Sequence, residues 1–171
     1  YAAARLLAER LESPDEAIPL LERAAARAPS NTKAAWRALS HLVGLLEASG
    51  QWEPAAAVRQ RRLALLIEPD SISFEQVRLS AIFDVVGRAD RAALHAARAL
   101  EYAPEDPSTL ERLDRALLRL GRHEDRLHAW AAQANADRPA AVRVAALTRA
   151  ADIAERHLAR RDDALALLRA A

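Results

Sequence analysis

Apolar residues recur along this chain at spacings of three and four, the periodicity of one face of an α-helix. Three such stripes stand out in the second and third quarters of the chain: Phe74, Val77, Ala81, Ile82, Val85 and Val86; Leu110, Leu113, Leu117 and Leu118; and Leu127, Trp130, Ala131 and Ala134. No segment alternates apolar and polar residues with the period of two that predicts a strand. The pattern therefore predicts an all-α protein.

Prolines and glycines divide the helical pattern at regular intervals. Prolines stand at positions 29, 69, 104 and 139, which are 40, 35 and 35 residues apart, and Gly50, Gly87 and Gly121 fall between them. Proline does not continue a helix, and glycine readily caps one. The chain thus predicts a helical hairpin repeated every 34 to 40 residues.

Helix-start signals support these boundaries. Ser13, before Pro14 and three residues ahead of Glu16, resembles a capping box, and Asp106 before Pro107 predicts another N-cap. A further helix is expected to open at Ser73 with Gln76, or one turn earlier at Ser71, and the last long helix at Asp137 or Arg138. The predicted helices are 1–12, 14–28, 31–49, 52–67, 72–86, 88–102, 107–120, 122–136, 138–159 and 161–171.

The hairpins resemble tetratricopeptide repeats. The second half of that motif usually has a turn glycine, an alanine five residues on, a bulky residue after four more, then an alanine and a proline. Gly87, Ala92, Ala99 and Pro104 match it, and only Ala96 stands at the bulky place. The same spacing recurs at Ala17, Leu21, Ala24 and Pro29, and at Ala164, Leu168 and Ala171. The first half of the motif is matched by Trp36, Leu39 and Val43, and by Gln76, Leu79 and Phe83.

Two features depart from the family pattern. The helix from Trp36 to Ser49 is about three residues long for the family, and Arg126 stands where an alanine is expected unless the register moves to Leu127. Other helical solenoids with longer periods, such as HEAT-like arrays, remain an alternative. The resemblance implies a right-handed superhelical solenoid of about five antiparallel helix pairs, at about 1–29, 30–69, 70–104, 105–137 and 138–171.

Composition narrows the range of functions. The chain of 171 residues is 51% hydrophobic, about a quarter of it is alanine, and its net charge of +1 comes from interspersed charges of both signs. We therefore expect no nucleic-acid partner. The absence of cysteine excludes a disulfide framework and a thiolate metal site, and fits the cytoplasm without excluding the periplasm. No apolar run is long enough to span a membrane, and both chain ends look cut from a longer protein.

The histidines and paired carboxylates that could serve in catalysis have structural explanations. The five histidines show no metal-ligand spacing, and the run from Arg122 to Asp125 is expected to be a solvated first helical turn. The carboxylate pairs also stand at predicted helix starts, where they complement the helix dipole: Asp15 and Glu16, Glu105 and Asp106, Glu124 and Asp125, Asp162 and Asp163. We therefore expect no enzyme activity, no cofactor and no metal.

Two groups of residues have both structural and functional interpretations. The run Arg59-Gln60-Arg61-Arg62 predicts an exposed arginine face with one buried aliphatic stem; the functional alternative is contact with an anion or an acidic peptide. Trp36 and Trp130 are expected in the core. Trp52 follows Gly50 at a hairpin corner, so both a core position and an interface position stay open for it.

The resemblance to tetratricopeptide repeats implies a protein-interaction scaffold whose first helices line a groove. It places the following side chains in that groove: Arg37, His41, Val77, Asp84, Glu111, Arg115, Arg149 and Arg156. Because arginine predominates, the expected partner is a protein or an acidic peptide. The alternatives are a self-assembly module, and the regulatory arm of an enzyme whose catalytic domain lies outside this segment.

Overall fold

The chain is built from helices joined by short connections. A computed structural model describes residues 14–28, 32–134 and 137–171, and within these ranges it contains no strand. Its helices are α2 (Pro14–Arg27), α3 (Lys33–Ala48), α4 (Trp52–Leu63), α5 (Pro69–Val85), α6 (Ala89–Tyr102), α7 (Pro107–Arg119), α8 (His123–Ala132), α9 (Ala140–Leu158) and α10 (Arg161–Ala170). The all-α prediction is confirmed; the predicted helix 1–12, the cap at Ser13 and the turn at Pro29 lie outside the described residues. None of the described helices is long and apolar enough to cross a membrane.

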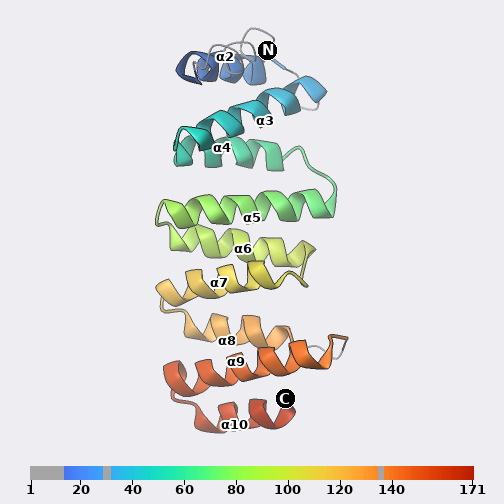
Figure 1. The fold of residues 1–171 in the computed structure, drawn as a ribbon, viewed down its shortest axis with the longest axis vertical. Helices are drawn as coiled ribbons and strands as arrows, with labels where there is room; N and C mark the ends of the chain where they lie inside the picture. Colours follow the sequence, from blue (N-terminus) through green and yellow to red (C-terminus); the bar gives the residue numbers. More distant parts are fainter. Residues whose placement is uncertain (1–13, 29–31, 135–136) are drawn as a thin grey trace. The chain divides into compact units, whose positions relative to one another are not determined.

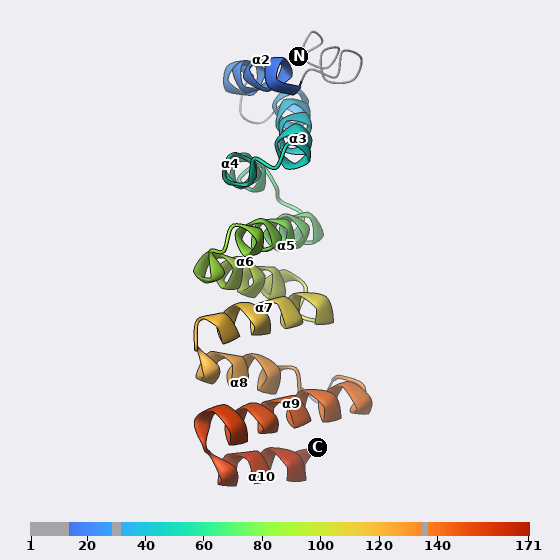
Figure 2. The ribbon, with the colours of Figure 1, turned by 60° about the vertical axis from the view of Figure 1, so that its left-hand side comes forward.

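The helices form two compact units. Unit 1, Tyr1–Gly87, holds α2 to α5, and unit 2, Arg88–Ala171, holds α6 to α10. Within each unit, every helix packs against the next one along the chain and runs in the opposite direction (Figures 1 and 2). The predicted pairs 30–69 and 105–137 therefore correspond to α3 with α4 and α7 with α8.

Glycines close the hairpin turns as the sequence predicts. Gly50 and Gly121 have φ of 71° and 66°, a left-handed conformation that costs glycine little. The following amides reach back to the ends of α3 and α7, from Gln51 N to Leu46 O at 2.8 Å and from Arg122 N to Leu117 O at 3.0 Å. The turn between α9 and α10 is made instead by Ala159, with φ of 55°. A side chain in this conformation is strained, so the turn stores energy that glycine would release.

Helix starts differ from the prediction at two places. Helix α5 begins at Pro69, not near residue 72, so the predicted caps at Ser71 and Ser73 are wrong. Proline fixes the backbone angle of the first helical turn and needs no hydrogen bond there, so it opens the helix itself. The predicted cap at Asp137 or Arg138 is also wrong, because Pro139 precedes α9. The Asp106 cap is confirmed: its carboxylate accepts from the Ser108 amide at 3.0 Å.

Alanine and leucine fill the cores, as their abundance predicts. In unit 1, the buried cluster includes Leu21, Leu42, Leu46 and Leu79. The apolar stripe predicted for the fifth helix is wrong in its register. Phe74 and Val85 of that stripe are 60% and 62% exposed, whereas the polar residues Glu75, Gln76 and Ser80 are buried beside Leu79 and Ile82.

Candidate functional site

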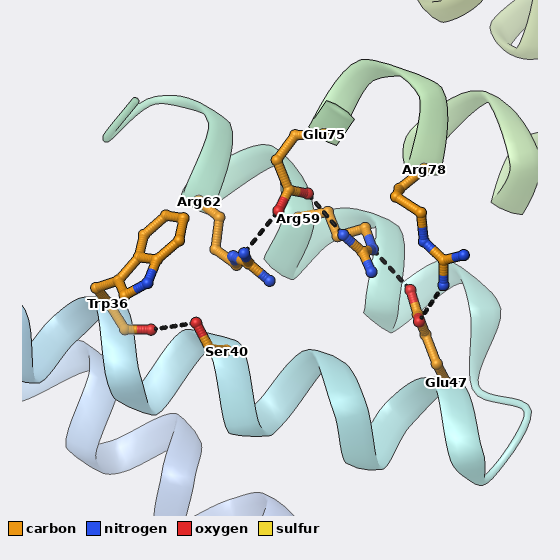
Figure 3. Close-up of polar contacts among 7 residues, drawn as sticks. All are labelled: Trp36, Ser40, Glu47, Arg59, Arg62, Glu75 and Arg78. Carbon is orange, nitrogen blue, oxygen red and sulfur yellow. Dashed lines mark hydrogen bonds and ion pairs between the residues drawn. The ribbon is translucent and has the colours of Figure 1, made fainter. Parts of the chain in front are cut away.

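A buried ion-pair network joins the three helices α3, α4 and α5 of unit 1 (Figure 3). Arg59 on α4 lies between two carboxylates: its Nε is 2.6 Å from Glu47 Oε1 on α3, and its Nη1 is 2.7 Å from Glu75 Oε2 on α5. Arg62 adds a second contact to Glu75, from Nη2 to Oε1 at 2.7 Å. Arg78 binds the other oxygen of Glu47 at 2.8 Å. Each carboxylate therefore holds two arginines, and Arg59 connects both.

Trp36 lies at one end of this network. The guanidinium carbon of Arg62 lies 4.4 Å from the centre of the Trp36 ring, in cation–π geometry. The Trp36 carbonyl accepts a hydrogen bond from Ser40 Oγ at 2.8 Å along α3. The Trp36 side chain, expected in the core, is half-buried and lies at the edge of the core. Its aromatic face contacts the guanidinium of Arg62.

Burial and pairing oppose each other in setting the protonation of these groups. Burial alone would raise the pKa of Glu47, but hydrogen bonds and charge from Arg59 and Arg78 hold that pKa below its usual value. Burial would lower the pKa of Arg59, but the hydrogen bonds that it donates to Glu47 and Glu75 raise that pKa instead. The pKa of Arg62 is lowered, mainly by burial. Pairing thus favours the charged forms of Glu47 and Arg59, although both side chains share little water.

The run Arg59-Gln60-Arg61-Arg62 is therefore not the exposed arginine face with one buried aliphatic stem that the sequence predicts. Arg59 is 5% exposed with its charged head inside, so it does not bury only an aliphatic stem. Arg62 is also turned inward toward Glu75, and only Gln60 and Arg61 of the run are exposed. Since a guanidinium offers five donors, it can satisfy two carboxylates on neighbouring helices at once. The functional alternative, contact with an anion, stays open for Arg61.

A second buried pair occupies the centre of unit 2. Arg126 on α8, at the place where the repeat motif has alanine, is 2% exposed. Its Nε and Nη2 donate to the two oxygens of Asp114 on α7, at 2.7 and 3.2 Å. Burial would raise the pKa of Asp114, but the hydrogen bond from Arg126 and further donors keep it low. The departure from the motif is accommodated by a carboxylate on the partner helix, and the register does not move to Leu127.

Three of the predicted groove residues meet beside this pair. Glu111, Arg115 and Arg149 line one hollow of about 240 Å³, together with Asp114 and Trp130. Glu111 and Arg115 come from α7 and Arg149 from α9. Arg149 donates from Nη2 to Asp114 at 3.3 Å and is exposed. Arg115 is exposed too, and has no ion-pair partner among the residues that the structure describes.

The other predicted groove residues lie apart from this hollow. Arg37 and His41 are on α3, and Val77 and Asp84 are on α5, all in unit 1. Arg156 follows Arg149 on α9 and pairs with Asp152 through its Nε at 2.6 Å. Two aspartates that the sequence interpretation left out, at positions 114 and 152, therefore neutralise part of the basic charge expected around the α9 arginines.

Two histidines of unit 2 stack on each other. The rings of His123, at the start of α8, and His157, near the end of α9, have centroids 4.4 Å apart and are inclined by 14°. His123 Nδ1 lies 3.3 Å from Arg126 Nη1, so it faces a cation. Burial and the charges of His123 and Arg126 lower the pKa of His157. Among the described residues, no group of three or more histidine or carboxylate side chains could hold a metal ion.

Sequence reasoning missed both buried networks, although a signal was present. Asp114 stands four residues after Leu110 and three before Leu117, which is an apolar-stripe position. Glu75 stands four residues before Leu79 and seven before Ile82, which is also a position on the apolar face of its helix. A charged residue on the apolar face of a helix needs a buried partner. In each unit, the first carboxylate stands twelve residues before its arginine: Glu47 before Arg59, and Asp114 before Arg126.

Comparison with solved structures identifies the fold, whereas comparison with family models and curated proteins finds no match. No protein-family model matches the sequence, and no curated protein matches it significantly. Among solved structures, a kinesin light chain from Podosopora anserina with nearly identical TPR-like repeats is 20% identical, with a TM-score of 0.53; the match covers 99% of this chain and 90% of that one.

Two further structures show the same likeness. MamA is 15% identical with a TM-score of 0.56, over 93% of this chain and 86% of that chain. YrrB, a TPR protein with an unusual peptide-binding site, is 17% identical with a TM-score of 0.56, over 98% and 80% of the two chains. The helical hairpins, their turn glycines and these likenesses agree: the chain has the fold of tetratricopeptide-repeat proteins.

Proposed function

We propose that this chain is a non-catalytic protein-interaction scaffold and that it binds an acidic peptide segment at the hollow between α7 and α9 of unit 2. The observation that carries the proposal is the meeting of Arg115 and Arg149 at one hollow. Arginines that flank a concave surface can bind a carboxylate through paired hydrogen bonds. Trp130 adds an aromatic wall that can cover the apolar part of a side chain.

Arg149 is free to exchange its partner at low cost. Asp114 already receives two hydrogen bonds from the buried Arg126, so it stays paired when Arg149 turns toward a ligand. The bond from Arg149 to Asp114 is the longest of the three, at 3.3 Å. A peptide carboxylate between Arg115 and Arg149 therefore leaves no buried charge without a partner. Glu111 at the rim disfavours a second acidic group on its side of the hollow.

The test compares pools of acidic and basic peptides in a binding titration. The wild type is expected to bind the acidic pool, and changing both Arg115→Glu and Arg149→Glu should weaken that binding by at least about tenfold. Binding should also weaken as salt rises, because exposed charges are screened. The control is the double variant Arg161→Glu with Arg169→Glu on α10, which makes the same charge change on another helix of unit 2. Equal binding of both pools, or an unchanged double variant with normal helicity, would show that this hollow is not the recognition surface.

Self-assembly is the second candidate. Its support is the outer face of α10, where Leu165 and Leu168 are each 50% exposed. Apolar side chains gathered on one helix favour association with another surface. Light scattering should then give a mass above that of one chain, and Leu165→Ser with Leu168→Ser should restore the monomer. If the protein is a monomer at every concentration, self-assembly is ruled out and the scaffold proposal stands.

A further inference from the structure

One arginine of the basic run on α4 has no role in the buried network. Arg59 and Arg62 turn toward Glu75, whereas Arg61 is exposed and has no ion-pair partner among the described residues. Residues one or two positions apart on a helix point in different directions, so Arg61 lies on another side of α4 from Arg59 and Arg62. There it lines a hollow between α2, α3 and α4, which we call the α2–α4 slot.

Apart from Arg61, the side chains that line the α2–α4 slot are apolar. They include Ala25 of α2, Ala35 and Leu39 of α3, and Ala64 and Leu65 just after α4, and the volume is about 330 Å³. Alanine side chains are too short to fill the space between three helices, which explains why a hollow remains. The volume lies in the range of small-molecule sites, and is roughly twice that of an engineered apolar cavity known to bind benzene. The slot has room for one ring or a short alkyl chain.

The residues next to the slot's lining in the sequence carry positive charge only. No Asp or Glu stands within two sequence positions of any residue that lines it, whereas Arg27, Lys33 and Arg37 do. Two hollows elsewhere in the described chain do contain carboxylates: the one beside Trp36 has Asp70 and Glu75, and the one at Arg115 has Glu111 and Asp114. An apolar slot with an unpaired guanidinium and basic neighbours complements a ligand with an apolar body and one negative charge.

We propose that the α2–α4 slot binds a small hydrophobic monocarboxylate, with the apolar group between the alanine walls and the carboxylate on Arg61. This site lies in unit 1 and is independent of the peptide site proposed in unit 2. Burial of the ring or alkyl chain supplies affinity, because the exposed alanines of the slot, Ala26 and Ala64, otherwise face water. Arg61 supplies selectivity, since a guanidinium pairs with a carboxylate through two parallel hydrogen bonds.

The experiment is a titration of the protein with three probes that share one ring and differ in charge. The probes are 3-phenylpropionate, its neutral amide 3-phenylpropionamide, and the cation 3-phenylpropylammonium, each followed by NMR chemical shifts or calorimetry. The acid is expected to bind with a dissociation constant of about 1 mM or lower, and at least about tenfold more tightly than the amide. The ammonium should not bind. A tripeptide ending in phenylalanine, with a free carboxylate, tests whether a peptide C-terminus uses the same slot.

Two variants localise the binding. Arg61→Gln should reduce the affinity for the acid to that of the amide, while Arg169→Gln in unit 2 should leave it unchanged. Ala64→Leu fills the slot from an exposed position and should abolish binding of the acid, while the matched control Ala57→Leu, exposed elsewhere on α4, should not. Circular dichroism shows that each variant is folded, and Ala26→Leu replaces Ala64→Leu if that variant is not. The proposal is overturned by the absence of saturable binding up to about 10 mM, by equal affinity for acid and amide, or by a folded Arg61→Gln protein that binds like the wild type.

Discussion

Replacing Glu75 by glutamine tests whether the buried network holds the three helices of unit 1 together. The Glu75 side chain is 2% exposed and is the meeting point of Arg59 and Arg62, whose side chains are 6% and 14% exposed. Glutamine keeps the size and the hydrogen-bonding oxygen but removes the negative charge. Two buried guanidiniums then share only the charge of Glu47, which Arg78 also uses.

The size of the effect follows from the burial of each group. Removing one partner of a buried ion pair costs about 3–5 kcal/mol in free energy of unfolding. The lower end applies here, because Arg59 keeps its contact of 2.6 Å to Glu47 and Arg62 is partly open to water. We therefore expect Glu75→Gln to lower the free energy of unfolding by about 3 kcal/mol.

Urea denaturation followed by circular dichroism measures this loss. The control is Glu53→Gln, the same chemical change at an exposed position on α4, which should stay within about 0.5 kcal/mol of the wild type. A double-mutant cycle between Arg59→Met and Glu75→Leu should give a coupling energy above about 1 kcal/mol. If Glu75→Gln loses no more stability than Glu53→Gln, the network does not stabilise the fold, and the reasoning from buried charge is wrong.

Three further expectations concern the turns, the core and the histidine pair. Ala159→Gly should raise the free energy of unfolding by about 1 kcal/mol, because glycine removes the strain of a left-handed backbone. Ala96→Asp should lower it by several kcal/mol, on the order of 3, because Ala96 is fully buried, whereas Ala89→Arg at the start of α6 should cost about 0.5 kcal/mol. His123→Asn should raise the pKa of His157 in an NMR titration, because it removes a neighbouring charge that lowers this pKa.

Each of these expectations can be contradicted by a measurement, and the one on the histidine pair also predicts how stability changes with pH. An unchanged Ala159→Gly protein in urea denaturation would show that the turn carries no strain. Equal melting shifts for Ala96→Asp and Ala89→Arg would contradict the orientation of α6. Since the pKa of His157 is lower when folded, the unfolded chain binds more protons near pH 6.5, so this group destabilises the protein as pH falls through that region. A His157 pKa that does not respond to His123→Asn would rule out this coupling.

Local patterns in the sequence predicted most of the helices. Helix propensity, turn glycines and the Asp106 cap act within a few residues of chain, so they can be interpreted without the tertiary structure. The helix starts at Pro69 and Pro139 were predicted less well, because proline can either end a helix or open one, and only the path of the backbone decides which.

The hollows that carry the two proposals were predicted less completely. The resemblance to tetratricopeptide repeats selected Arg115 and Arg149, which do meet at one hollow, but it also selected Arg37 and Asp84, which lie on separate helices of unit 1. It gave no indication of the α2–α4 slot, because a hollow depends on how far apart the helices pack. The spacing of residues along the chain does not predict the distance between packed helices.

The sequence by itself determined the helical hairpins, their turns and the alanine-rich packing, because these follow from the chemistry of neighbouring residues. Only the tertiary structure decided which charges are buried. Arg59 and Arg61 are two residues apart on the same helix, yet one is locked between Glu47 and Glu75 while the other faces an apolar slot. The difference arises because a charge can be buried only where the neighbouring helices place its counter-charge within hydrogen-bonding distance, and that placement belongs to the packing of the helices and not to any one segment.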